Sequence, residues 1–300
     1  MNRLVSLNPP LPFKATCCIC ESDQAQAIYV YLHEKKEYHL LKCHCGHLFI
    51  HPIPLIELDA RNMDSVEDAD FWGNSFLKNL HTRLVIQPEI EKVKKVFNKS
   101  GANLLDIGCG TGWTTAIWKE AGFQTIGLES SPVRSKIAKE KYHLDVYPDH
   151  LENFKTDQLF DVIIMRHLFE HIEDPVAMLK KIKKFLKPNG ILLIVIPNIA
   201  CIGRYVFREN WEWVLPWHLH FYTPKTLSRL LTKTGFIKIE IYQTPSPLWY
   251  PHTLNKAIFG SNPKFKFPHS MALFLSLPIV LLGWIFNLND NMTLIFRNDR

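Results

Sequence analysis

The sequence has little that would place it among repeat, secreted or disordered proteins. It contains no internal repeat or low-complexity tract, and its 47% hydrophobic and 21% charged residues are typical of a chain that folds around a core. Met1–Ala15 carries three prolines where a secretory signal needs a continuous apolar stretch, so no export signal is predicted. The formal net charge of +6 is modest and dispersed, and by itself it favours neither nucleic acid nor an anionic membrane as a partner.

Cysteines are few and unevenly distributed. Five of the seven lie within Cys17–Cys45, while Cys109 and Cys201 stand alone. Secreted scaffolds held by disulfides have a more even distribution, so the sequence predicts a protein of the reducing cytoplasm.

The clustered cysteines have a spacing suited to a metal ion. Two residues separate the first pair, one residue separates the second, and 22 residues lie between the pairs, which consist of Cys17, Cys20, Cys43 and Cys45. Four thiolates in this arrangement can surround one tetrahedral zinc, as in a zinc ribbon, and we predict a structural zinc over free thiols. Because ribbons usually have two residues inside each pair, another nearby side chain could replace one ligand: Cys18, His44 or His47.

Changes of pattern divide the chain into three parts. Residues 1–54 form the zinc-ribbon-like module and end in the proline-rich His51–Pro54. Residues 55–99 form a connecting segment with one helix near its end, in whose first turn Pro88 can sit. Residues 100–300 form an α/β domain that contains a hydrophobic insertion at 243–291.

From Ala102 onward, short apolar runs alternate with amphipathic stretches. The predicted strands are Leu104–Ile107, Thr125–Leu128, Phe160–Met165 and Ile191–Ile196, and the predicted helices are Thr114–Ala121, Pro132–Tyr142, Asp174–Lys187 and Thr223–Thr234. This alternation predicts a parallel sheet with helical crossovers. The lysines of Asp174–Lys187 indicate a solvated face, and Gly235–Tyr242 and Met292–Arg297 have the alternation of half-exposed strands.

A glycine loop follows the first of these strands. Gly108, Gly110 and Gly112 alternate with other residues before a helix, so the backbone can turn sharply and approach a bound nucleoside. The spacing differs from the Gly-x-Gly-x-x-Gly of dinucleotide sites, which makes NAD the weaker interpretation. Glu129 ends the second strand, where an acid reaches ribose hydroxyls in such folds.

The loop resembles the first motif of class I S-adenosylmethionine-dependent methyltransferases. The resemblance spans residues 103–242 and includes three further segments, Phe160–Met165, His167–Pro175 and Leu186–Gly190. It implies a Rossmann-like sheet, mostly parallel with an antiparallel last strand. It also implies that Asp106 and the three glycines surround the methionine part of the cofactor, that Glu129 holds its ribose and that Asp149 lies near its adenine. The loop around Asp149 departs from the family pattern. Some bacterial members that act on sugars or other secondary metabolites have a similar small cysteine module before the catalytic domain.

Four histidines are candidate catalytic residues. Methyl transfer from a sulfonium is an in-line displacement, and an acceptor hydroxyl or acidic carbon must also lose a proton, which histidine can accept near neutral pH. His167 and His171 follow a buried strand, whereas His218 and His220 lie in the aromatic segment Trp211–Tyr222. Structural roles remain open, because His171 could orient the turn and the aromatic rings could fill a core. His167 to His171 also match the His-x-x-Glu-His motif of a zinc peptidase class.

A hydrophobic segment, Met271–Phe286, lies within the insertion. Its 16 residues are fewer than the roughly 20 that span a bilayer, and Pro278 interrupts them. A single bilayer crossing would also leave Met292–Arg297 on the wrong side to pair beside Gly235–Tyr242. A shallow interfacial helix or a buried cap remains, and the preceding Lys264 and Lys266 favour peripheral membrane contact.

Together these features predict a methyltransferase that uses S-adenosylmethionine to methylate O or C of a small-molecule or lipid-linked acceptor, sugar or quinone-like. The predicted location is the cytoplasm, with peripheral contact at the inner membrane face. The alternative is a zinc-ribbon adaptor whose methyltransferase-like domain binds cofactor without turnover. Nucleic acid is disfavoured as a substrate, because Met165-Arg166-His167 stands where amino-group methylases have Asn/Asp-Pro-Pro-aromatic.

Overall fold

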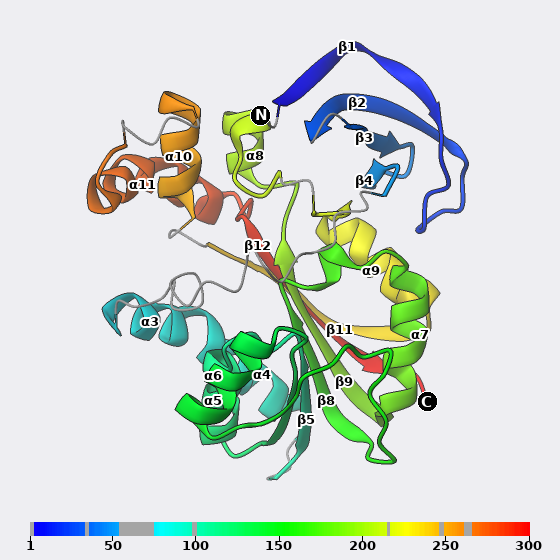
Figure 1. Cartoon of the computed structure of the whole chain (residues 1–300), viewed down its shortest axis with the longest axis vertical. Helices are drawn as coiled ribbons and strands as arrows, with labels where there is room; N and C mark the ends of the chain where they lie inside the picture. Colours follow the sequence, from blue (N-terminus) through cyan, green and yellow to red (C-terminus); the bar gives the residue numbers. More distant parts are fainter. Residues whose placement is uncertain are drawn as a thin grey trace.

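Two β-sheets organise the protein (Figure 1). The structure is a computed structural model, and it describes residues 3–33, 36–53, 75–97, 101–214, 217–245, 249–260 and 266–300. The strand order is β11-β12-β9-β8-β5-β6-β7 in the seven-stranded central sheet and β1-β2-β3-β4-β10 in the five-stranded N-terminal sheet.

The central sheet has the predicted Rossmann-like arrangement. Its parallel strands are β5 (Asn103–Ile107), β6 (Gln124–Leu128), β7 (Asp145–Tyr147), β8 (Phe160–Arg166) and β9 (Leu186–Pro197). The last strand, β12 (Asn291–Asn298), runs antiparallel between β9 and β11 (Phe236–Thr244). The mostly parallel sheet with an antiparallel last strand is therefore confirmed.

The prediction that Met292–Arg297 is half-exposed was wrong. Every residue of this segment is buried except Arg297, which is partly buried. The apparent polar alternation came from Thr293, whose hydroxyl lies 3.3 Å from the buried carboxylate of Glu89 and so has a polar partner inside the protein.

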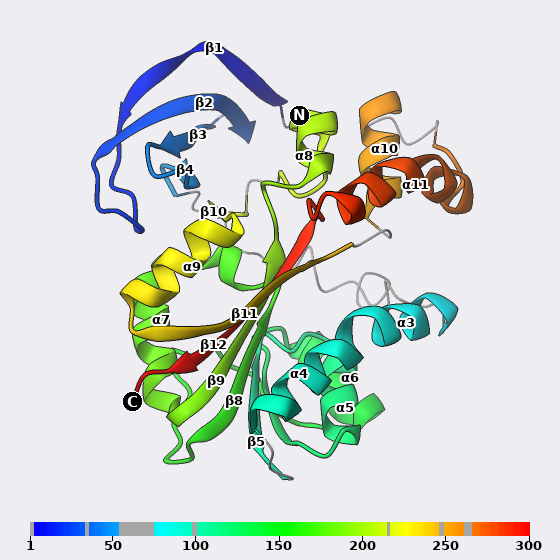
Figure 2. The same cartoon turned by 180° about the vertical axis from the view of Figure 1, so that it is seen from behind.

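Helices cover both faces of the central sheet (Figures 1 and 2). One face packs against α7 (Pro175–Phe185) and α9 (Pro224–Lys233) and the other against α4 (Gln87–Phe97) and α5 (Trp113–Glu120). Upstream of α4 the chain is already helical, in α3 (Ser75–His81) and the π-helical turn η1 (Thr82–Ile86), and α6 (Pro132–Tyr142) leads to β7. The side chain of Asp174 caps α7 by accepting from the Ala177 N–H at 2.9 Å. This helix ends at Phe185, earlier than predicted, because β9 already begins at Leu186.

The N-terminal sheet is completed by the rest of the chain. Its strands are β1 (Arg3–Lys14), β2 (Gln24–His33), β3 (Lys36–Cys43), β4 (Leu48–His51) and β10 (His220–Phe221). β10 pairs antiparallel with β4, and one hydrophobic core contains Leu41 and Phe49 of this sheet together with Met165 and Tyr222 of the α/β part. The predicted boundary at Pro54 and the first part of the connecting segment lie outside the described residues.

Three helices lie beyond the carboxyl end of β9 (Figures 1 and 2). They are α8 (Ile202–Phe207), α10 (Tyr250–Phe259) and α11 (His269–Ile285), and a 3-10 turn η3 (Arg208–Asn210) follows α8. Among the residues that the structure describes, no helix is long and apolar enough to cross a membrane.

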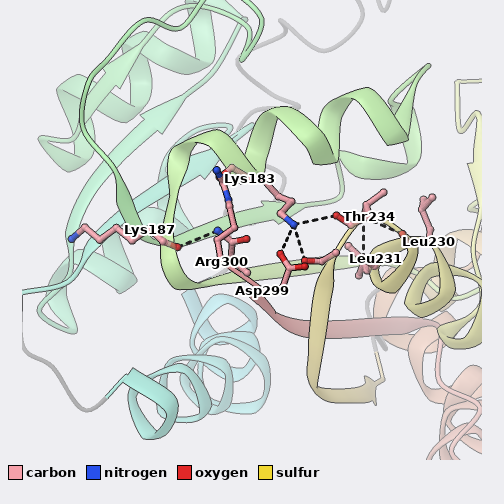
Figure 3. A network of polar contacts seen from close by, with 9 residues as sticks. Lys183, Lys187, Leu230, Leu231, Thr234, Asp299 and Arg300 are labelled. Carbon is pink, nitrogen blue, oxygen red and sulfur yellow. Dashed lines mark hydrogen bonds and ion pairs between the residues drawn. The ribbon is translucent and has the colours of Figure 1, made fainter.

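Lysines of α7 bind other parts of the protein (Figure 3). Lys183 Nζ donates to the carbonyl of Gly235 at 2.9 Å and contacts Asp299 Oδ1 at 2.5 Å, and Arg300 donates to the Lys183 carbonyl. Lys181 of α7 donates to the Glu152 carbonyl at 2.7 Å, and Lys187, near the start of β9, pairs with Asp161 at 2.8 Å. The predicted solvated face therefore also ties α7 to the start of β11 and to the last two residues.

Candidate functional site

The glycine loop turns sharply at the end of β5. Gly108, Gly110 and Gly112 all have positive φ angles, of 73°, 57° and 80°. The N–H groups of Gly108 and Cys109 both donate to the Leu128 carbonyl, at 2.8 and 3.0 Å, which fastens the loop to the end of β6. A Cβ placed on Gly110 would meet no atom within 4 Å, so the backbone at this position faces open space. A ligand can therefore approach the backbone there.

Glu129 lies directly against this loop. Its Oε2 accepts from the Gly110 N–H at 2.8 Å and its Oε1 accepts from the Ser131 N–H at 2.9 Å. Each carboxylate oxygen can accept more than one hydrogen bond, so acceptor capacity remains for a ligand hydroxyl. The predicted neighbours, the glycine loop and Glu129, are thus in direct contact.

Asp106 and Asp149 have different surroundings. Asp106 is buried and accepts from Thr115 Oγ1 of α5 at 2.6 Å, and burial raises its pKa to about 6. Asp149 lies two residues beyond β7, where its carboxylate accepts from Asn153 Nδ2 at 2.9 Å and from the His150 N–H at 2.7 Å. These two hydrogen bonds hold the pKa of Asp149 below its usual value.

His167 stands at the end of β8, next to β5. Its φ of 50° is left-handed, and its N–H donates to the Val195 carbonyl at 2.8 Å. The imidazole stacks on Trp213 with a centroid distance of 5.2 Å and an interplanar angle of 1°. Trp213 also stacks with His218, at a centroid distance of 5.8 Å. The aromatic segment and His167 are therefore brought together.

His171 and His218 form the inner part of the histidine cluster. Their rings meet edge to face at 4.7 Å, and His171 Nδ1 lies 2.8 Å from the Trp217 carbonyl. Burial lowers the pKa of His218 to about 3, helped by the nearby His171. Glu170 is buried beside them, with Oε1 3.7 Å from His167 Nδ1. His218 is consequently a neutral base at physiological pH.

The peptidase motif lacks the helix that it requires. His167 precedes a three-residue 3-10 turn, η2 (Phe169–His171), rather than lying on an α-helix with His171. One group that could hold a metal here consists of Glu170, His171 and His218, without His167. The arrangement of two histidines on one helical face is absent from this described segment.

His220 lies with a different set of residues. Its Nδ1 is 3.1 Å from Nε2 of His47, whose Nε2 is 3.7 Å from Cys18 Sγ. Burial lowers the pKa of His220 to about 4 and that of His47 well below its usual value. The four predicted catalytic histidines thus separate into one cluster of three and one residue at the N-terminal sheet.

The four predicted zinc ligands converge. The Sγ atoms of Cys17 and Cys45 are 3.7 Å apart and those of Cys20 and Cys43 are 3.3 Å apart, and all four lie within 4.8 Å of one another. A tetrahedral zinc with Zn–S bonds of about 2.3 Å would place its sulfurs about 3.8 Å apart. All seven cysteines are free thiols, so the cluster is a group of thiols that matches a zinc site in size.

One buried ion pair near the site was not predicted from the sequence. Glu89, at the start of α4, is buried and pairs with Arg166 at the end of β8. Burial, with Arg166 and His167 nearby, lowers the pKa of His81 to about 3. In the structure Ile90 and Val93 of α4 are buried, and Glu89 lies one helical turn before Val93 on the same face. Its burial could have been suspected only from that position.

Comparisons with known proteins agree with this geometry. Residues 78–241 match a family model described as a methyltransferase domain. The ubiquinone biosynthesis O-methyltransferase of Rhodopseudomonas palustris (strain HaA2) is 32% identical over 154 residues, which cover 47% of this chain and 60% of that protein. The mitochondrial enzyme of the same name from Schizosaccharomyces pombe is 31% identical over 175 residues, 55% of this chain and 63% of that protein.

The family model covers more than half of the chain. The chain belongs to the methyltransferase domain family. Similar folds occur in a SAM-dependent methyltransferase from Thermotoga maritima (20% identity, TM-score 0.50, 77% of this chain and 97% of that one) and in the plantazolicin methyltransferase BpumL (18%, 0.52, 81% and 92%). At these identities the likeness shows the fold alone. The chain spans about 60% of the length of the curated relatives it matches. Most of its N-terminal sheet and helices α10 and α11 lie outside residues 78–241, which the family model matches.

Proposed function

We propose that this methyltransferase transfers a methyl group from S-adenosylmethionine to an oxygen or carbon of a small or lipid-linked acceptor. The observation that carries the proposal is the backbone of Gly110, which faces open space after β5. Its N–H donates to Glu129 at the end of β6, and His167 lies at the end of the adjacent strand β8. A phenolic hydroxyl on a quinone-like acceptor is our first choice, because relatives carry the name ubiquinone biosynthesis O-methyltransferase.

The residues present fit this cofactor. Gly108, Gly110 and Gly112 would surround its methionine part together with Asp106, and Glu129 would accept from its ribose hydroxyls. Asp149 at the end of β7 would lie towards the adenine. When bound, S-adenosylmethionine supplies a methyl group on a positively charged sulfur. The protein then has to orient the acceptor and exclude water.

His167 is the base in this proposal. Its Nδ1 is buried next to Glu170, and its side chain is 29% exposed, so Nε2 is the nitrogen that can receive the proton of an acceptor hydroxyl. The resulting imidazolium would lie 3.7 Å from the Glu170 carboxylate, which stabilises its charge. Trp213 holds the ring in place by stacking. His171 and His218 would support the cluster, whereas His220, which lies in β10 beside His47, would act on the acceptor only indirectly.

The test separates binding from turnover. Isothermal titration with S-adenosylhomocysteine should show binding that falls at least tenfold in Glu129→Ala and stays unchanged in Glu140→Ala, an exposed carboxylate on α6. His167→Asn should keep cofactor binding, since Asn tolerates the left-handed φ, and should lose about 10²–10⁴-fold in turnover of prenylated catechols. Binding without any turnover of phenols or sugars in the wild type would favour the non-catalytic adaptor instead.

We also propose that Cys17, Cys20, Cys43 and Cys45 hold a structural zinc. Their separations support it, because they are close to those expected around one tetrahedral zinc. Native mass spectrometry should find zinc that is lost on Cys20→Ser. A metal-free wild type after purification with zinc present would contradict the proposal.

Peripheral membrane contact completes the proposed function. On α11 the small residues Ala272, Ser276 and Gly283 are buried, whereas the exposed fractions of Phe274 and Trp284 are 71% and 67%. Large apolar side chains that face outward suit an apolar environment. The other large exposed apolar residues described on these helices are Tyr205 and Val206 of α8, Ile258 of α10, and Met271, Leu275, Leu277, Leu281, Leu282 and Ile285 of α11, which is followed by the exposed Phe286.

A basic hollow adjoins this apolar surface. It measures about 390 Å³ and is lined by Lys256, Lys266, His252 and His269, with Glu212 as its acidic residue. Two lysines beside an apolar helix suit anionic lipid headgroups. The N–H of Asn198, just beyond β9, donates at 2.8 Å to the carbonyl of Asp290, where the chain returns from α11. His167 follows β8, which is paired with β9. The apolar helices and His167 therefore lie at the same edge of the sheet. A lipophilic acceptor could thus reach His167 from a membrane.

Vesicle flotation tests this contact. The wild type should float with vesicles containing phosphatidylglycerol and float less with pure phosphatidylcholine. Phe274→Glu/Trp284→Glu should remain in the soluble fraction. The matched control is Leu159→Glu, an exposed leucine just before β8 at the opposite end of the sheet, which should float like the wild type. A wild type that stays soluble with both kinds of vesicle would refute membrane contact and leave the methyltransferase proposal intact.

A further inference from the structure

A second group of metal-ligating side chains lies beside the four-cysteine cluster and shares none of its residues. It consists of Cys18, His47 and His220, whose ligand atoms lie within 4.8 Å of one another. His47 and His220 are buried and Cys18 is partly buried. Cys18 stands between Cys17 and Cys20, the two members of the first ligand pair, so one short turn would contribute to two sites.

The distances in this group fit a tetrahedral ion. Cys18 Sγ is 3.7 Å from His47 Nε2, and that nitrogen is 3.1 Å from His220 Nδ1. Zinc bonds of about 2.3 Å to sulfur and about 2.0–2.1 Å to nitrogen would place sulfur and nitrogen about 3.6 Å apart and two nitrogens about 3.3 Å apart. Both observed separations agree with these values within a few tenths of an ångström.

The orientation of His220 also suits a ligand. Burial lowers the pKa of His220, and the backbone of Glu173 and Ile172 near its ring acts in the opposite direction. A backbone carbonyl near one ring nitrogen favours the hydrogen there, and the other nitrogen, here the one facing His47, then presents a lone pair. Histidine ligands of metals usually donate their second N–H to such a carbonyl or carboxylate. Asp174 acts electrostatically on both Cys18 and His220 and would partly balance a cation.

We infer that Cys18, His47 and His220 bind a second zinc ion, with water in the fourth position. Cys18 would bind as the thiolate and release its proton. Cys18 follows β1 and His47 precedes β4, whereas His220 belongs to β10 of the methyltransferase part. The ion would therefore join the N-terminal sheet to the segment that contains Trp213 and His218. The inference does not depend on methyl transfer.

Zinc stoichiometry tests the inference. Native mass spectrometry of the full chain, purified with zinc present, should find two ions in the wild type and one in each of Cys18→Ala, His47→Ala and Cys20→Ser. His150→Ala, which removes an exposed histidine elsewhere, should keep two. His220→Cys should also keep two, because thiolate replaces imidazole as a zinc ligand. One ion in the wild type, or two in Cys18→Ala, would overturn the inference.

Cobalt spectra distinguish the two sites if a variant folds poorly. Cobalt added to metal-free wild type should fill two sites in sequence, one with strong thiolate charge transfer from four sulfurs and one with weaker charge transfer from a single sulfur. Two results together would contradict the second site: a single spectral step with cobalt, and reaction of Cys18 with iodoacetamide in the folded zinc-bound protein. They would indicate that His47 and His220 share a neutral hydrogen bond instead of a metal ion. Titration with S-adenosylhomocysteine reports separately on the cofactor site.

Discussion

At the scale of single residues, glycines in the same loop have different reasons for lacking a side chain. A Cβ on Gly112 would come within 2.6 Å of a Leu144 methyl group and 2.7 Å of the Ala138 Cβ, both in the core. A Cβ on Gly110 would meet nothing within 4 Å. We therefore expect Gly112 to be needed for packing and Gly110 for approach of a ligand.

Alanine at each position should separate these roles. The left-handed φ costs an L residue about 1–2 kcal/mol, so Gly110→Ala should lose about that much unfolding free energy and also bind S-adenosylhomocysteine more weakly. Gly112→Ala adds overlap in a packed core, which typically costs about 1–3 kcal/mol more. Urea unfolding and isothermal titration measure the two effects. Equal destabilisation with unchanged affinity in Gly110→Ala would contradict the assignment.

A buried histidine should make the protein sensitive to acid. The pKa of His81 is lowered from an ordinary value of 6.5 to about 3, because burial and then Arg166 and His167 disfavour its charged form. Since the unfolded chain binds the proton more readily, the stabilising contribution is complete above pH 6.5 and is lost as pH falls from 6.5 towards 3. Between pH 7.5 and 5.5 the wild type should lose about 1 kcal/mol more unfolding free energy than His81→Gln. Urea denaturation at both pH values measures the difference, and parallel losses in the two proteins would refute it.

At the scale of secondary-structure elements, the lysines of α7 differ in their function although they look alike in the sequence. Lys183 reaches the turn before β11 and the C-terminal Asp299 (Figure 3), whereas Lys184 is exposed. Helical periodicity predicted the polar face of α7 correctly but could not show which lysines have partners, because these partners are more than 50 residues away in sequence.

Replacing each lysine by methionine should distinguish them. Lys183→Met leaves the Gly235 carbonyl and Asp299 without this donor and should lower the unfolding free energy by about 1 kcal/mol, a small value because Asp299 is exposed and screened by solvent. Lys184→Met should change it by less than about 0.5 kcal/mol. Thermal unfolding in low and high salt measures both. An equal effect of the two substitutions would show that the network adds no stability.

At the scale of the whole molecule, the sequence predicted what is local or periodic. The central sheet, the glycine loop and its contact with Glu129 follow from strands and helices that alternate along the chain. Pairing of the two-residue strand β10 with β4 could not be predicted, since so short a strand has no periodicity and its partner lies about 170 residues earlier. The grouping of His220 with His47 depends on this pairing. The contact between Thr293 and Glu89 could not be predicted either, because the two residues are about 200 positions apart in sequence. This contact gives Thr293 a polar partner within the buried strand β12.

That pairing and the shared core predict that the N-terminal sheet and the methyltransferase part unfold together. Cys17 and Cys43 are buried in the first, and Cys109 and Cys201 are buried in the second, so pulse alkylation in increasing urea, read by mass spectrometry, reports on both in one sample. With a chelator present, so that zinc protects no thiol, all four cysteines should become reactive at the same urea concentration. If only one part unfolded, side chains of the shared core would be exposed to water, so a partly unfolded state is unfavourable. Reaction of Cys17 and Cys43 at clearly lower urea would instead show that residues 1–53 form an independent module held in place mainly by their metal.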